Sequence, residues 1–332
     1  MDARITKKRL GHMLSYDWIK IIALVAAAIV LFSLLFTMIA TRASTGQTFY
    51  IYSYYDTFVK KESVNDLDNL KEKGALSYDV LDVTNSALAK NEYLAQMLAA
   101  YIAAQQGDVF FITDTTPTPE EGQEDEILYS EWQSFISGGY YSAFARLGNE
   151  TYNESDLDDR KKNYFEELEK YLNKFYSNDF KANEIDEQAV EDTFRARMKK
   201  DKRFKTEKKI KAGIVEEKER IESLKKAYLN VLKAIDEDII SIKTTKLYND
   251  VNKNGELEEN EWVELCRGID ISNIGNITDF IVNKNTENSN EGLTMAIFDW
   301  ANYQYHLQFE PITYLNFLIL EYGNDAQKAL FE

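Results

Sequence analysis

The chain has 332 residues, of which 44% are hydrophobic and 29% charged, so it is long enough for one large or two small domains with real cores. Its formal net charge of −17 would repel nucleic acid, and we exclude a nucleic-acid-binding function. Its single cysteine, Cys266, cannot form an intramolecular disulfide, which is ordinary for a bacterial surface protein. Two histidines leave almost no material for a multi-histidine metal site or a His-based catalytic triad.

The first predicted element is an uncharged segment, Ile21 to Ala40, with only two polar residues. As a helix it is about 30 Å long, which matches the hydrocarbon core of a bilayer. Basic residues are concentrated before it, so the positive-inside rule places residues 1–20 in the cytoplasm and the bulk of the chain outside the cell. We therefore predict a single-pass, uncleaved anchor in the lipid bilayer of a bacterial cell membrane. The alternative is a cleaved signal peptide with a poor cleavage site at 41–43.

The next elements alternate between strands and helices. Strands rich in β-branched and aromatic residues alternate with segments that have helical apolar spacing, in the order 47–55 (strand), 63–73 (helix, stopped by Gly74), 76–84 (strand), 90–106 (helix) and 108–113 (strand). This β-α-β-α-β order predicts parallel strands that are buried on both faces and joined by right-handed crossovers.

These residues resemble a known family. The β-α-β-α-β start, and above all the run 94–112 (LAQMLAAYIAAQQGDVFFI), resembles bacterial extracellular solute-binding proteins of the type 2 periplasmic-binding fold. The strand and helix in 294–323 are similar to the return of such chains to their first lobe. The resemblance implies an α/β lobe built from 47–116 and 293–332, and a binding protein like those of ABC transporters.

The middle of the chain, 127–292, is predicted to be a mainly helical insertion that follows Pro117 and Pro119. From 156 to about 249 the pattern is helical, and apolar residues recur every seven positions at Ile214, Ile221, Tyr228, Ile235 and Ile242. This seam predicts a helical hairpin within the chain. Pairing between two chains is the alternative.

The segment 250–261 (DVNKNGELEENE) matches the EF-hand calcium loop, with helices expected on both sides. Gly255 provides the tight turn, and the calcium ligands are predicted to be Asp250, Asn252, Asn254, Glu256 through its carbonyl, Glu258 and Glu261. With two Asn ligands, Ca²⁺ would bind weakly and serve a structural role. The alternative is a solvated turn.

A ligand cleft is predicted from the topology, because open α/β sheets bind ligands beyond the carboxyl ends of their strands. The residues expected there would suit a small solute such as a sugar or a peptide: Tyr54, Tyr55, Asp56, Thr84, Asn85, Thr113, Asp114 and Trp300. The alternative is that they are ordinary strand-end and turn residues.

A basic run, Arg195 to Lys211, holds ten basic residues against two acidic ones. It could contact an anionic wall polymer or lipid head groups. The alternative is a solvated helix face that pairs with Glu216, Glu217 and Glu219.

We find no catalytic motif and expect no enzyme activity. The sequence favours a membrane-anchored extracytoplasmic binding protein that is stabilised by calcium. The alternative is a non-catalytic cell-envelope scaffold that engages an envelope protein through its helical hairpin. A binding cleft predicts a pocket lined by the strand-end loops, whereas a scaffold predicts covered loops and an exposed apolar patch on the helices.

Overall fold

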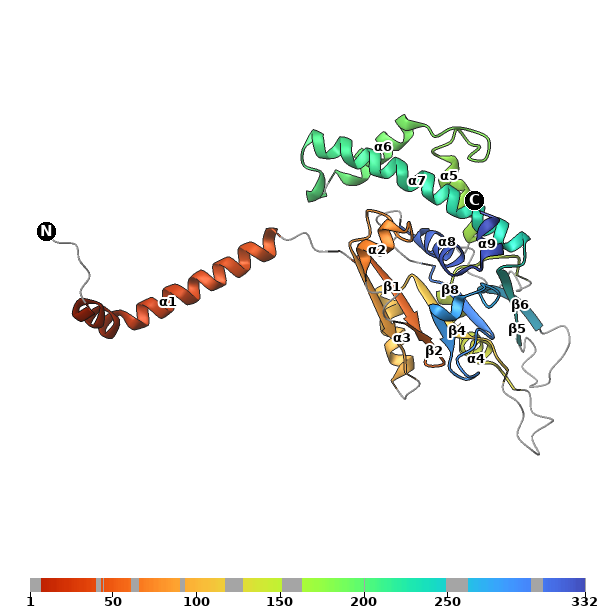
Figure 1. Cartoon of the computed structure of the whole chain (residues 1–332), viewed down its shortest axis with the longest axis horizontal. Coiled ribbons are helices and arrows are strands. Elements are labelled where there is room, and N and C mark those ends of the chain that lie inside the picture. Colours follow the sequence, from red (N-terminus) through yellow and green to blue (C-terminus); the bar gives the residue numbers. More distant parts are fainter. Residues whose placement is uncertain are drawn as a thin grey trace. The chain divides into compact units, whose positions relative to one another are not determined.

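The computed structural model describes residues 7–39, 43, 45–60, 66–89, 93–116, 128–150, 163–199, 201–248, 262–299 and 307–331 (Figure 1). The chain forms two compact units, divided after Arg42. The first contains the helix α1, Lys7–Ile39. Its stretch Trp18–Leu35 has a mean hydropathy of 2.6 and no buried side chain, so by length and composition it can be a membrane anchor or a signal sequence.

The second unit is built on a six-stranded mixed sheet. Its order is β3-β1-β4-β8-β6-β5, and β1 pairs in parallel with β3 and β4, whereas β8, β6 and β5 are antiparallel to their neighbours. The strands are β1 Thr48–Ser53, β3 Asp82–Ala87, β4 Val109–Thr113, β5 Ser241–Tyr248, β6 Trp262–Asp270 and β8 Leu293–Ile297. A second, two-stranded sheet pairs β2, Thr57–Val59, with β7, Ile281–Asn283.

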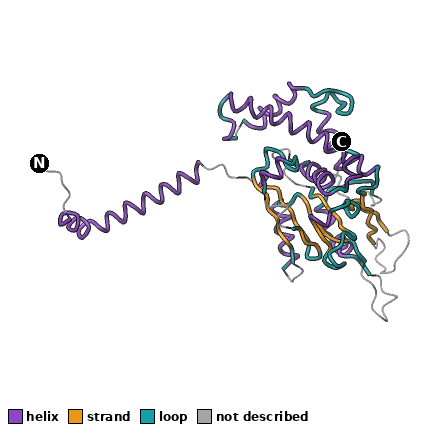
Figure 2. Tube along the Cα trace, in the orientation of Figure 1, coloured by secondary structure: helices purple, strands orange, loops and turns teal. Residues whose placement is uncertain are grey.

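Helices cover both faces of the six-stranded sheet, as Figure 2 shows by colour. The α-helices are α2 Leu67–Glu72, α3 Leu94–Ala104, α4 Glu131–Ser137, α5 Tyr164–Asn173, α6 Glu187–Met198, α7 Glu207–Asp236, α8 Glu310–Tyr322 and α9 Asp325–Ala329. Short 3-10 turns lie at η1 Thr45–Gln47, η3 Tyr140–Ala143, η4 Lys202–Phe204 and η6 Ile277–Asp279.

Successive side chains of the central strands point to opposite faces of the sheet and contribute to two separate hydrophobic cores. On β4, Val109 and Phe111 contribute to a large core with residues of α2, α5, α7 and α8. Phe110 and Ile112 point to the other face, where they pack with residues of α3 and α4. All four side chains are fully buried, which explains why this strand is a nearly continuous apolar run in the sequence.

The predicted mixture of strands and helices is confirmed, although the sheet is mixed and not wholly parallel. The parallel β1, β3 and β4 are connected through α2 and α3, and β8 and α8 lie where a terminal strand and helix were expected. The strand predicted at 76–84 was placed too early, because β3 begins only at Asp82. Residues 76–81, at the start of that range, belong to the connection between α2 and β3.

The prediction of helix on both sides of 250–261 was wrong. Residues 241–248 and 262–270 are the paired strands β5 and β6, with Tyr248 opposite Trp262. The run SIKTTKLY is rich in β-branched residues, a strand signal that the seven-residue spacing obscured. The segment 127–292 therefore adds three strands to the two sheets in addition to its helices.

The helical seam is confirmed only within α7. Ile221, Tyr228 and the intervening Leu224 and Val231 are buried in the larger core, whereas Ile242 belongs to β5. In Figure 1, α7 runs beside α6 and above α8, and it contacts both. The seam thus packs within the chain, with α6 and α7 forming a hairpin.

Candidate functional site

The strand-end residues predicted as a cleft do come together in part, but they are covered. Tyr54, Asp56 and Thr113 are buried, with exposed fractions of 7%, 0% and 0%. Asp56 accepts hydrogen bonds from the backbone N–H and the hydroxyl of Thr113. The tyrosine ring packs edge-to-face on Phe135 of α4, at 5.6 Å between ring centroids.

The start of α4 closes this edge of the sheet. Tyr55 donates a hydrogen bond to Glu131, and the N-cap hydroxyl of Ser130 donates to Asp114. Asp114 also forms an ion pair with Lys243 of β5, at 2.5 Å. These predicted ligand residues are therefore occupied by contacts within the chain.

The other predicted cleft residues are not at this edge. Thr84 and Asn85 lie within β3 and not beyond its carboxyl end. β3 is the outermost strand on one side of the sheet. Trp300 lies outside the described residues. In the sequence it follows β8, which runs antiparallel to β4. The end of β8 at Ile297 therefore pairs with Val109, at the start of β4, and not with Thr113 at its end.

Burial has an electrostatic consequence at Asp56. Desolvation raises the pKa of its carboxyl to about 6, although hydrogen bonds from Thr113 oppose the shift. Its Oδ1 atom has no hydrogen-bond partner among the described residues. Asp56 is thus a buried acid in a closed site.

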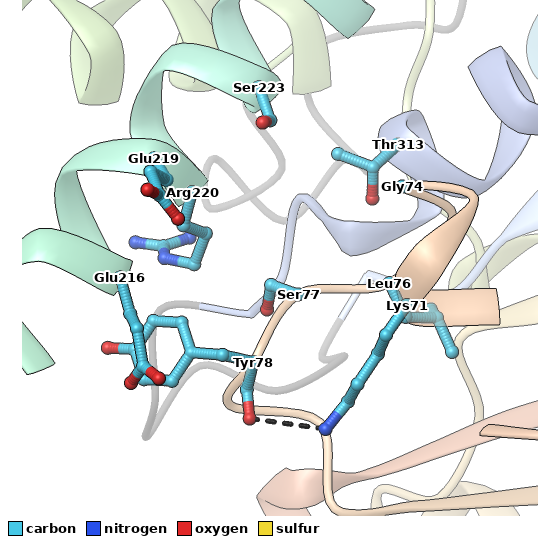
Figure 3. A pocket seen from close by; sticks show the side chains of 10 residues that line it. All are labelled: Lys71, Gly74, Leu76, Ser77, Tyr78, Glu216, Glu219, Arg220, Ser223 and Thr313. Atoms are coloured by element: carbon cyan, nitrogen blue, oxygen red, sulfur yellow. Dashed lines mark hydrogen bonds between the residues drawn. The ribbon is translucent and has the colours of Figure 1, made fainter. Parts of the chain in front are cut away.

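A pocket of about 300 Å³ lies elsewhere, between the α2–β3 connection and α7. Figure 3 shows side chains from the two sides facing each other across it. Its lining consists of Lys71, Gly74, Leu76, Ser77, Tyr78, Glu216, Glu219, Arg220, Ser223 and Thr313.

The end of α2 turns the chain into this pocket. Gly74 adopts φ of +69°, the backbone N–H of Gly74 donates to the carbonyl of Lys71, and that of Ala75 donates to Leu70. These bonds form a Schellman motif, which needs a residue in the left-handed region and so favours glycine. The glycine stop seen in the sequence is confirmed, and it directs Ser77 and Tyr78 toward α7.

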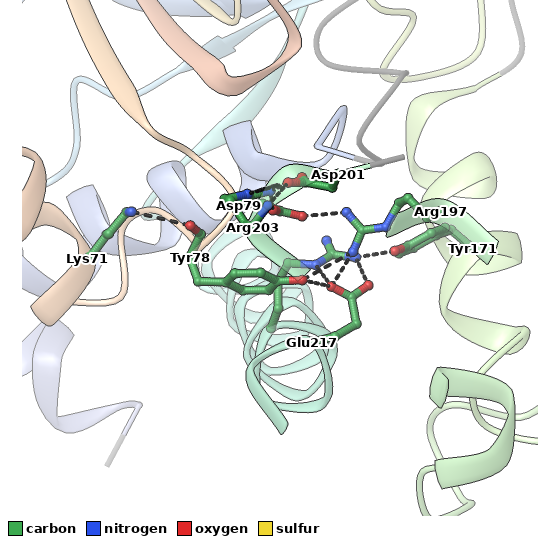
Figure 4. A network of polar contacts seen from close by, with 9 residues as sticks. Lys71, Tyr78, Asp79, Tyr171, Arg197, Asp201, Arg203 and Glu217 are labelled. Carbon is green, nitrogen blue, oxygen red and sulfur yellow. Dashed lines mark hydrogen bonds and ion pairs between the residues drawn. The ribbon is translucent and has the colours of Figure 1, made fainter. Parts of the chain in front are cut away.

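A network of buried ion pairs lies beside the pocket and joins α6, α7 and the α2–β3 connection (Figure 4). Arg197 of α6 pairs with both Asp79 and Glu217. Arg203 also pairs with Asp79, at 2.6 Å, and Arg220 pairs with Glu217 at 2.9 Å. Asp201 pairs with Arg203 at 2.8 Å as well, so three guanidinium groups meet three carboxylates and the charges balance within the network.

The pKa of Glu217 is lowered by its arginine partners. Burial alone would raise it, but Arg220 and Arg197 lower it to about 2, and the Tyr78 hydroxyl donates a further hydrogen bond at 2.8 Å. The carboxylate therefore remains charged throughout the physiological range.

The pocket lining contains groups that are less well satisfied. Burial lowers the pKa of Lys71, whose Nζ donates a 3.3 Å hydrogen bond to the carbonyl of Tyr78. Burial, and then the charge of Asp79, raises the pKa of Glu216. The hydroxyl of Ser77 is buried with no hydrogen-bond partner among the described residues. The site thus offers an ammonium, carboxylates and hydroxyls to a small polar molecule.

Most of this site could not be predicted from the sequence, because its residues lie on segments far apart in the chain. One signal was present: Glu217 interrupts the apolar seam of α7, and it is fully engaged by Arg197 and Arg220. An acid within an apolar helix face indicates a buried charge partner, although the sequence does not identify the partner.

The calcium prediction falls on 250–261, outside the described residues. Among the residues that the structure describes, no three His, Cys, Asp or Glu side chains are grouped to hold a metal ion.

Comparison with known proteins gives no matching family model, no similar curated protein and no similar solved structure. Function must therefore be argued from the site itself.

Proposed function

We propose that the protein is a membrane-anchored extracytoplasmic binding protein whose ligand occupies the pocket between the α2–β3 connection and α7. The observation that carries the proposal is the pairing, in one pocket, of a Lys71 ammonium and a Glu216 carboxylate whose pKa values are both shifted toward the neutral form by burial. A ligand with opposite charges would offset that desolvation.

The ligand class that fits is a small zwitterion, such as an amino acid or a short peptide. Its carboxylate would contact Lys71, and its ammonium would contact Glu216 and Glu219. A volume of about 300 Å³ is at the lower end for small-molecule sites. Ser77 and Ser223 supply hydroxyls for its remaining polar groups.

The topology supports the resemblance to solute-binding proteins. Three parallel strands are followed, at the end of the chain, by a strand and a helix that return to the same sheet. The anchor would be α1, with residues 1–20 in the cytoplasm and the second unit outside the cell.

The test is calorimetric titration of the purified full chain with amino acids, dipeptides and neutral sugars. We expect heat with a zwitterion and its loss in Lys71→Met. Lys60→Met is the matched control, because Lys60 is exposed and lies outside the pocket lining. No heat with any compound, or equal binding by Lys71→Met, would remove the proposal, and binding of sugars alone would change the ligand class.

A scaffold function is the second candidate, because the strand-end loops are covered and α3 exposes apolar surface. Residues 93–106 contain no charge, and Tyr93 and Met97 are 56% and 36% exposed. An uncharged exposed helix on so acidic a chain could contact an envelope protein. If the chain still bound an envelope protein after substitutions had blocked the pocket, this candidate would be favoured.

We also infer that 250–261 binds Ca²⁺. The structure replaces the expected flanking helices with β5 and β6, but the ligand spacing that motivates calcium lies within the loop sequence. Calcium would then stabilise the connection between two strands.

A further inference from the structure

The α6–α7 hairpin carries a concentration of lysines around its turn. We call this group the lysine tip: Lys199, Lys202, Lys205, Lys208, Lys209 and Lys211. All six are exposed. None of them forms an ion pair with another described residue.

Three acids near the lysine tip are paired with arginines. Arg195 pairs with Glu191 and Glu207, and Arg203 pairs with Asp201. Glu217, expected in the sequence as a partner for this basic run, is bound by arginines in the buried network. The arginines of the run thus serve the fold, while the six lysines of the lysine tip face solvent.

The lysine tip also breaks a local rule of helix stability. Lys208 and Lys209 lie in the first turn of α7, where the positive end of the helix dipole disfavours cations. No described acid compensates them, since Glu207 of the same turn is held by Arg195. Positions that violate a local rule without a structural gain are expected where function requires them.

An apolar side chain adjoins the lysines. Lys208, Lys211 and Val215 are spaced i, i+3 and i+7, so they share one face of α7, and Val215 is 57% exposed. A soluble polyanion would leave this valine in water. A lipid interface accepts both groups, because lysines reach the head groups and apolar side chains enter the acyl boundary.

We propose that the lysine tip docks onto anionic phospholipid head groups. The inference rests on the proposed membrane anchorage, which would keep a lipid surface at high effective concentration near the second unit. Attraction of this kind is additive over lysines and is weakened by salt.

The test uses the full chain in lipid nanodiscs made either of phosphatidylcholine or of phosphatidylcholine with phosphatidylglycerol. An environment-sensitive dye is attached at Ala212→Cys, an exposed position, in a Cys266→Ser background. We expect a blue shift of emission in the phosphatidylglycerol discs, its absence in phosphatidylcholine discs, and its loss at high salt.

Two variants with the same change in net charge show whether binding depends on the lysine tip itself or only on the net charge of the chain. The first reverses Lys205, Lys208, Lys209 and Lys211 to Glu and should abolish the shift. The control reverses four exposed lysines elsewhere, namely Lys174, Lys226, Lys246 and Lys284, and should retain it. Acidic residues in the first turn favour the helix, so the first variant should fold.

Three outcomes would overturn the inference. If the chain elutes with the discs but shows no shift in either lipid, the tip does not bind membrane while the anchor stands. If soluble polyglycerol phosphate produces the shift and phosphatidylglycerol discs do not, the partner is an anionic polymer. If the chain does not elute with the discs, the anchorage fails and this proposal fails with it.

Discussion

Arg197 on α6 and Glu217 on α7 form an ion pair, at 2.5 Å between Nη2 and Oε2, in which the two side chains are only 5% and 1% exposed. The pair links the helical hairpin to the α2–β3 connection, because Arg197 also reaches Asp79. Buried pairs of this kind contribute little net stability compared with apolar residues, but they are costly to break.

Replacing Glu217 by Gln should therefore destabilise the protein strongly. The change removes the carboxylate that Arg220 and Arg197 share in the buried network, and breaking a buried ion pair by removing one partner costs about 3–5 kcal/mol. Denaturant unfolding of the full chain measures the loss. Glu222→Gln, an exposed change on the same helix, should stay within about 0.5 kcal/mol, and a similar small effect at Glu217 would contradict the buried network.

Stability should depend on pH through Asp56. Its pKa of about 6 in the folded state lies above the ordinary value of 3.8, so its contribution to stability is fully present below pH 3.8 and is lost as the pH rises to about 6. The loss amounts to about 3 kcal/mol. Asp56→Asn should flatten the unfolding free energy over this range, whereas Asp236→Asn, at an exposed position, should keep the wild-type slope. An unchanged slope in Asp56→Asn would show that this acid is not buried.

Glu217 gives the opposite slope at lower pH. Because its pKa is lowered to about 2, its contribution is present above pH 4.5 and is lost as the pH falls toward 2. Wild-type protein should unfold more readily across this range, and Glu217→Gln should lack that dependence. Acid titration followed by circular dichroism measures the difference, and equal acid sensitivity in both proteins would argue against it.

At Gly213 of α7 we expect the usual preference of helices for alanine over glycine to be reversed. In an exposed helix, Gly→Ala stabilises by about 1 kcal/mol. A Cβ at Gly213 would instead overlap the rings of Phe194 and Phe204, which pack between α6 and α7. Gly213→Ala should cost about 1–3 kcal/mol in thermal unfolding. Ala212→Gly tests the ordinary preference one residue earlier and should lose about 1 kcal/mol; stabilisation by Gly213→Ala would contradict this packing.

Calcium binding can be tested at one residue. Glu261 is the predicted bidentate ligand, so Glu261→Gln should abolish a calcium-induced rise in melting temperature. Glu259→Gln, at a non-ligand position of the same loop, should retain it. No rise in the wild-type protein at millimolar calcium would dismiss the ion.

The α/β half was predictable because its signals are local. The uncharged run of β4 and the glycine after α2 each specify a conformation within a few residues. The β5–β6 pair was missed because Ile242 happened to continue a seven-residue spacing, and only the β-branched neighbours indicated a strand.

The candidate site was harder to predict for a different reason. Lys71, Glu216 and Thr313 meet through tertiary packing, and nothing in the sequence links them. At the predicted cleft, α4 covers the strand ends, and its Trp132 donates a hydrogen bond to Thr245 of β5. Coverage of this kind is a property of the folded chain.

The position of β8 between β4 and β6 has a consequence for biosynthesis. The parallel strands are synthesised first, yet the edge of β4 that pairs with β8 has no partner until residues 293–297 leave the ribosome. An open edge of this kind invites aggregation. Completion of the sheet must therefore wait until β8 has been synthesised, and a nascent chain of this protein should depend on holding chaperones until then.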